Sequence, residues 1–178
     1  MRAIQLGWIT ASAAFAAFVM GGTAPRVLGA DVSDADKSFV AAATSGGMAE
    51  VKLGQYAADN GSNDKVKKFG KHMVKDHTKA NKELAALAKK EGIDAPSDMS
   101  SEDSATVDAM MKLSGADFDK AYAAGMVSDH QKTIDLFTQE AKNGTDPALK
   151  KFASDTVPTL QKHLDLAQKM QAAVGEAK

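Results

Sequence analysis

The chain has 178 residues, of which 44% are hydrophobic and 25% are charged, and its formal net charge is −1. It contains no cysteine, which excludes disulfide bonds, thiol chemistry and thiolate metal sites. Both arginines lie within the first thirty residues, so the rest of the chain has a net charge of −3 and no arginine. This composition argues against nucleic-acid binding and against bidentate recognition of phosphate or carboxylate.

Residues 1–30 have the layout of a secretory signal peptide. Arg2 gives a positive start, residues 4–20 form an apolar run, and the segment ends on Gly29-Ala30, where we expect cleavage. The apolar run is short for a membrane span, although an uncleaved anchor is the alternative. We therefore expect an exported protein, periplasmic or associated with the outer envelope, with one folded domain over residues 31–178.

Residues 31–178 predict four long helices and no strand. Apolar residues recur at helical spacing over about residues 33–59, 64–90, 116–142 and 147–173, and Asn-Gly turns end the first and third of these segments. Pro158 lies inside the last segment and should kink it. A polar connector, residues 92–115, separates the second helix from the third and should contain a short helix near residues 107–113.

The two halves of this domain repeat each other. Residues 58–69 match residues 141–152 without a gap, at an offset of 83, and the matched region is a helix end, a turn and a helix start. The repeat predicts two helical hairpins joined by a long crossover, which is an all-α, ferritin-like four-helix bundle. We expect both hairpin turns at one end of the bundle. A simple up-down bundle capped by the short helix is the alternative.

Each long helix carries one polar residue on its otherwise apolar stripe: Glu50, His77, His130 and His163. Such groups are costly in a core unless they pair or bind something. Residue counts to the turns place all four within roughly 12 Å along the bundle axis. Imidazole suits zinc, copper, iron and nickel. We therefore expect one transition-metal ion, zinc or copper rather than di-iron, bound by these four residues. A metal-free network of hydrogen bonds is the alternative.

Two pentads, Met-Val-Lys-Asp-His at 73–77 and Met-Val-Ser-Asp-His at 126–130, repeat almost verbatim. Met and His four residues apart share a helix face, so Met73 and Met126 are possible soft ligands for Cu(I), although Met at this spacing is also ordinary core filler. Asp76 and Asp129 are expected to orient the imidazoles from outside the metal's ligand set. His72 lies about 140° from His77 around the helix and is expected at the surface.

These motifs, with Met-Ala-Glu50-Val-Lys-Leu-Gly, Phe118-Asp-Lys-Ala-Tyr122 and Leu160-Gln-Lys-His163-Leu, resemble the bacterial exported family catalogued as domain of unknown function 4142. The resemblance covers about residues 36–170. It implies export and a ferritin-like bundle, since members are often labelled predicted outer-membrane proteins, and it brings no established activity. Ferritin-like di-iron proteins use more core Glu residues and Glu-x-x-His motifs. This chain has one core Glu and no such motif, which argues against oxygen activation.

We therefore expect an exported bundle that handles a metal or is stabilised by it, with no catalytic residue and no organic cofactor. The alternative is a non-catalytic envelope stress or interaction protein with a metal-free polar core. In that case Val107, Met110 and Met111 of the connector would dock an envelope protein partner. An oxidoreductase of the ferritin-like group is the weakest of the three interpretations.

Overall fold

The computed structural model describes residues 32–176, so the predicted signal segment, residues 1–30, lies outside the described residues. Five helices follow one another: α1 (Asp34–Asn60), α2 (Asp64–Glu91), α3 (Ser101–Met110), α4 (Gly115–Asn143) and α5 (Pro147–Glu176). Residues 32–176 contain no strand, which confirms the all-α prediction. No helix in this part of the chain is long and apolar enough to cross a membrane.

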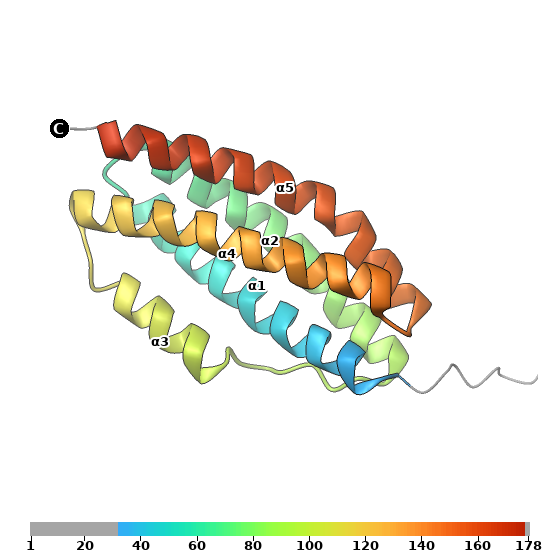
Figure 1. Ribbon diagram of the computed structural model, residues 1–178. Helices are drawn as coiled ribbons and strands as arrows, with labels where there is room; N and C mark the ends of the chain where they lie inside the picture. The colour runs from blue at the N-terminus through green and yellow to red at the C-terminus, as the bar shows by residue number, and fades with distance from the viewer. Residues whose placement is uncertain (1–31, 177–178) are drawn as a thin grey trace, which may run out of the picture.

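The four long helices form two hairpins, as the internal repeat predicts. α1 packs against α2 and α4 packs against α5, while α2–α5 and α1–α4 contacts join the two hairpins into a bundle (Figure 1). The crossover contains the short helix α3, which lies on the outside of the bundle against α1. α3 begins several residues earlier than the sequence predicts, and α5 continues as a helix through Pro158.

The expectation that both hairpin turns lie at one end is wrong. Asp36, in the first turn of α1, accepts hydrogen bonds from the N–H of Thr145, at 2.9 Å, and from its hydroxyl, in the α4–α5 turn. Asp119, near the start of α4, accepts from the N–H groups of Ser62 and Asn63 in the α1–α2 turn, at 3.0 and 2.7 Å. The start of each hairpin therefore holds the turn of the other, at opposite ends of the bundle (Figure 1).

The long crossover explains this arrangement. A helix of the length of α2 spans about 42 Å, and the extended residues before α3, together with α3 itself, are enough to cover that distance. The chain returns to the end where α2 begins before α4 starts, so α2 and α4 run in the same direction (Figure 1).

Asp36 and Asp119, which bind the two hairpin turns, occupy equivalent positions of the internal repeat. Asp36 and Asp119 are 83 residues apart, as are Ser62 and Thr145, so each half of the chain clamps the other in the same way. Burial alone would raise the pKa of Asp36, but hydrogen bonds from Thr145 and Ser33 outweigh it and hold that pKa well below its usual range. These two buried carboxylates fix the hairpins end to end.

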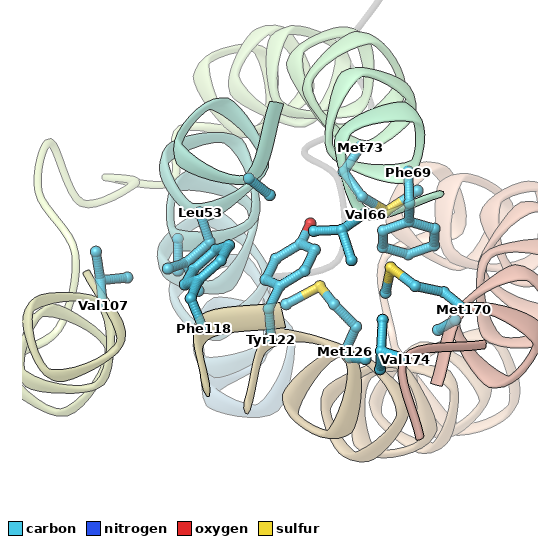
Figure 2. Close-up of a cluster of buried hydrophobic side chains, with 14 residues drawn as sticks. Leu53, Val66, Phe69, Met73, Val107, Phe118, Tyr122, Met126, Met170 and Val174 are labelled. Carbon is cyan, nitrogen blue, oxygen red and sulfur yellow. The ribbon is translucent and has the colours of Figure 1, made fainter. Parts of the chain in front are cut away.

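The hydrophobic core is divided into two clusters. One, near the α1–α2 turn, includes Leu53, Phe69, Met73, Phe118, Tyr122, Met126, Met170 and Val174 (Figure 2). The other, near the α4–α5 turn, includes Phe39, Val40, Leu84, Phe137, Leu149 and Leu160. On α2, α4 and α5 the histidine of the stripe falls between the two clusters, and on α1 Glu50 lies at the edge of the first cluster, so the bundle has a polar layer at its middle.

The apolar side chains of α3 face the bundle. Val107 is fully buried, and Met110 and Met111 pack against the cluster shown in Figure 2. Ser45 of α1 fixes the start of α3, because its hydroxyl oxygen accepts from the N–H of Ser100 at 2.8 Å. Of the three connector residues that the sequence offers as a docking surface, Val107 is part of the core, and Met110 and Met111 are partly buried against it.

Candidate metal centre

The four stripe residues meet in the middle of the bundle even though the turns lie at opposite ends. Glu50, His77, His130 and His163 each lie near the midpoint of a long helix. When helices of similar length pack side by side in a bundle, their midpoints lie at the same height along its axis, whether the helices are parallel or antiparallel. The predicted convergence is therefore found, for a different reason from the one that the sequence suggested.

Three imidazoles from three helices form the centre of the polar layer. The ring centroids lie 5.8 Å apart for His77 and His130, 5.4 Å for His77 and His163, and 5.4 Å for His130 and His163. One ring nitrogen from each histidine lies within 4.8 Å of the other two. All three side chains are buried, with exposed fractions of 8%, 1% and 2% for His77, His130 and His163.

Hydrogen bonds on the outer side of two rings leave the inner nitrogens free. Nδ1 of His130 donates to the carbonyl oxygen of Met126 at 2.9 Å, so its Nε2 carries a lone pair. Nε2 of His163 donates to Asp76 at 3.1 Å, so its Nδ1 carries the lone pair. Within the described residues, these two nitrogens and Nε2 of His77 are buried and have no hydrogen-bond partner.

The environment keeps the three imidazoles neutral. Burial, followed by the neighbouring imidazoles, lowers the pKa of His77 to about 3. Burial lowers the pKa of His130 to about 4, and it also lowers the pKa of His163, against the opposing effect of Asp76. Neutral imidazole is the form that binds metal ions, so the three side chains are in the ligating form at neutral pH.

Glu50 is near this set but not part of it. Its Oε1 lies 3.6 Å from Nδ1 of His130, the nitrogen opposite the free one, and the carboxylate is absent from the groups whose ligand atoms lie within 4.8 Å of one another. Burial, and then the Asp129 carboxylate, raise the pKa of Glu50 well above its usual range. The structure therefore places the Glu50 carboxyl group behind His130, outside the set of three imidazoles, where the sequence predicted a fourth ligand.

The two aspartates of the repeated pentads have different partners. Asp76 orients an imidazole, as predicted, but the imidazole is that of His163 on α5, across the helix interface, rather than its neighbour in sequence. Asp129 lies near Glu50 rather than a histidine, since it is, after burial, a cause of the raised pKa of that carboxyl group. Burial would raise the pKa of Asp76, but the hydrogen bond from His163 and the nearby basic side chains outweigh it and lower that pKa. Asp76 is thus a charged acceptor at the edge of the layer.

The two candidate soft ligands lie on one side of the polar layer. Met73 and Met126 are buried among Phe69, Tyr122 and Met170 (Figure 2). The ring of Phe69 lies 6.4 Å from that of His130, so this cluster adjoins the imidazoles. Met126 contributes its carbonyl oxygen to the site by holding His130. The packing accounts for both methionines without a metal.

Some polar residues of the layer carry no signal in the helical pattern. His72, with 44% of its side chain exposed, faces Asp76 at 3.3 Å. The side chain of Asn81 lies against Gly47, where a Cβ atom would come within 2.0 Å of its Oδ1. The hydroxyl of Tyr122 is buried without a hydrogen-bond partner in the described chain. In the sequence, only the four-residue spacing of His72 and Asp76 could have indicated that these two side chains face each other.

A small cavity opens beside the imidazoles. Its volume is about 70 Å³, which is room for one or two water molecules. Its polar lining includes Glu50, Asp76, His77, Asn81, Asp129 and His163, together with three threonines, Thr133, Thr156 and Thr159. The arrangement can bind a single ion through three neutral nitrogens, with water reaching a remaining coordination position.

Comparisons with known proteins give a family and a fold. The sequence profile described as domain of unknown function (DUF4142) matches residues 23–170. No curated protein matches the chain. A solved structure titled as a crystal structure of a DUF305 fragment from Deinococcus radiodurans is similar with a TM-score of 0.69 at 13% identity, covering 83% of this chain and 100% of that one. This likeness supports the helical-bundle fold alone.

Proposed function

The chain belongs to the family described as domain of unknown function (DUF4142), and since that description assigns no activity, we propose a function from the geometry of the polar layer. The protein binds one transition-metal ion through His77, His130 and His163. Glu50 lies outside this ligand set, beside Nδ1 of His130. The role is metal handling or stabilisation of the bundle by the metal.

The unpartnered nitrogens carry this proposal. Three buried ring nitrogens and Oε2 of Glu50 have no hydrogen-bond partner in the described chain. A buried polar group without a partner costs about 1–3 kcal/mol, so the set costs several kcal/mol against a net stability of about 5–15 kcal/mol for a typical domain. An ion that binds the three nitrogens removes most of this cost.

The same observation argues against a metal-free network of hydrogen bonds. In such a network each imidazole would donate to or accept from a neighbour, whereas Nε2 of His130 and Nδ1 of His163 both carry lone pairs, and neither they nor Nε2 of His77 have a hydrogen-bond partner in the described chain. Of the three connector residues that the interaction protein would use for docking, Val107 is buried and Met110 and Met111 are partly buried against the core, so they give this alternative little support.

The size of the cavity favours ion binding over turnover of an organic substrate. Pockets for small molecules have volumes of about 300–1,000 Å³, and the cavity beside the imidazoles has about 70 Å³. Three imidazoles with one open position resemble the ligand set of several zinc enzymes. Here the cavity that His77 and His163 line is much smaller than such a pocket.

Zinc or copper fits the donor set best. Imidazole nitrogens bind zinc at about 2.0–2.1 Å, which in a tetrahedral site places them roughly 3.4 Å apart. The nitrogens lie within 4.8 Å of one another, so rotations of the side chains that move each by about 1 Å complete the site. The single Glu, behind His130, does not supply the carboxylates that a di-iron centre needs.

Metal titration of the purified protein tests the proposal. We expect one equivalent of zinc or copper per chain and, at about 100 times Kd, stabilisation of roughly 2.7 kcal/mol, or a rise in Tm of about 5–10 °C. His163→Ala should abolish both effects, and Gln168→Ala, which changes an exposed residue of the same helix, should leave them intact. Protein that remains metal-free, with an unchanged Tm, contradicts the proposal.

We infer further that this metal chemistry takes place outside the cytoplasm. The support is the sequence of residues 1–30, with its positive start, apolar run and small residues before position 31. Fractionation of the native cells should place the protein in the envelope or periplasmic fraction, with an N-terminus at Asp31. Full-length protein in the cytoplasmic fraction contradicts this inference.

A further inference from the structure

A second group of possible ligands lies on the solvent side of the buried histidines. Nε2 of His72 lies 3.3 Å from Oδ2 of Asp76, and Nε2 of His163 lies 3.1 Å from the same oxygen. The rings of His72 and His163 are 5.3 Å apart. These three side chains offer ligand atoms that all lie within 4.8 Å of one another.

The two groups share His163 through opposite ring nitrogens. Its Nε2 faces Asp76 and His72, while its Nδ1 is the buried nitrogen without a partner. The side chains of the outer group run from solvent to core, with exposed fractions of 44% for His72, 29% for Asp76 and 3% for His163. Asp76 also lines the cavity beside the imidazoles, so it faces both groups.

We propose that His72, Asp76 and His163 form an outer loading site, through which a metal ion reaches the buried imidazoles. This inference rests on the proposed function and adds the route of entry. The ion first binds Asp76 and the exposed imidazole, with Nε2 of His163 as the third ligand. The ion then moves past the His163 ring to the inner nitrogens, where Nδ1 of His163 replaces Nε2 as the ligating atom. While the ion is at Nε2 the imidazole proton is carried on Nδ1, and it returns through water to Nε2 when the ion binds Nδ1, so the ring stays neutral and only coordination bonds and this one N–H bond change.

Coordination, rather than long-range attraction, accounts for capture at this site. Lys71 and Lys75 flank His72 on α2, and both are exposed. Their positive charge repels a free cation over distances up to the Debye length, about 10 Å at 0.1 M salt. Loading through this site should therefore become faster, rather than slower, as the ionic strength rises.

The outer site can be separated from the buried one by equilibrium binding of Co²⁺, whose visible absorption reports imidazole ligation. In the His130→Ala chain, which lacks one inner ligand, we expect one weakly bound Co²⁺. In the double variant His72→Ala, His130→Ala we expect that binding to be lost. If the double variant binds as the single variant does, the outer site is not formed.

Loading kinetics test the route in the otherwise unchanged protein. With His72→Ala, which removes one ligand of the outer site, we expect zinc to reach the buried site about tenfold more slowly. The displacement of zinc from a chromophoric chelator measures this rate. Gln168→Ala, the matched exposed substitution on α5, should load at the wild-type rate. Loading at the wild-type rate in His72→Ala overturns the inference and leaves the proposed function intact. If His130→Ala instead binds metal as the wild type does, the proposed buried site is itself refuted.

Discussion

Replacing His130 by leucine should have opposite effects on the metal-free and metal-bound protein. The imidazole is 1% exposed, and its Nε2 has no partner in the described chain. Removing a buried polar atom that lacks a partner recovers about 1–3 kcal/mol, and leucine keeps an apolar side chain of similar size next to Phe69. Against this gain stands the loss of the hydrogen bond to the Met126 carbonyl, worth about 1 kcal/mol.

We therefore expect the His130→Leu protein in EDTA to be as stable as the wild type, or more stable by about 1 kcal/mol. With zinc at about 100 times the wild-type Kd, the wild type should gain roughly 2.7 kcal/mol and the variant almost nothing. Urea unfolding followed by circular dichroism, with and without zinc, measures all four values. A large loss of stability in EDTA would refute the reasoning, because it would mean that the imidazole already has its partners without a metal.

Three other predictions concern the rest of the bundle. Asp36→Ala should destabilise the protein by about 2–4 kcal/mol. Because the pKa of Asp36 is low in the folded protein, the wild type should lose stability as pH falls below about 4. The variant should lose less, and chemical unfolding of both proteins at pH 3 and 7 measures the difference. Burial, and then the nearby Asp36 charge, raise the pKa of Glu140 from 4.5 to about 7, so ionisation destabilises the fold as pH rises through this range. Glu140→Gln should then be more stable than the wild type at pH 8, by on the order of 1 kcal/mol, and an equal stability at pH 5 and 8 in the wild type would contradict this. Gly70→Ala should lower the free energy of unfolding by about 1–3 kcal/mol, because its Cβ would lie 2.5 Å from the carbonyl oxygen of Gly54. Gly46→Ala, whose Cβ would have nothing within 4 Å, should instead stabilise α1 by about 0.5–1 kcal/mol. Thermal unfolding of both variants tests this difference.

Helical periodicity was sufficient to find the long helices and the polar position on each. Apolar stripes and Asn-Gly turns give α1, α2, α4 and α5 to within a few residues, because both signals are local. The same periodicity placed His77, His130 and His163 on the inner faces, where the structure has them.

The direction of the second hairpin was not contained in any local pattern. It depends on whether the crossover returns along the bundle, which its length allows but does not require. The reciprocal contacts of Asp36 and Asp119 decide it, and these were visible in the sequence only as two acidic residues 83 positions apart, each near the start of a helix.

The spacing of residues in the sequence also could not predict which polar side chains contact one another. Asp76 was expected to orient an imidazole, but the imidazole is across an interface, on α5. Glu50 lies on the inner face of α1, at the level of the three histidines. Its carboxyl group nevertheless faces Nδ1 of His130 rather than the ring nitrogens that have no hydrogen-bond partner. Rotamers and the small angular offsets between helices determine such pairings, and these emerge only once the helices are packed.

X-ray absorption spectroscopy of the zinc-loaded protein tests the central claim most directly. A site formed by His77, His130 and His163 predicts about three imidazole nitrogens at roughly 2.0–2.1 Å from the metal, with the outer-shell scattering of imidazole rings, and the loss of about one of them in His130→Leu. A spectrum of oxygen ligands alone, unchanged in that variant, would show that the ion binds elsewhere and would contradict the account.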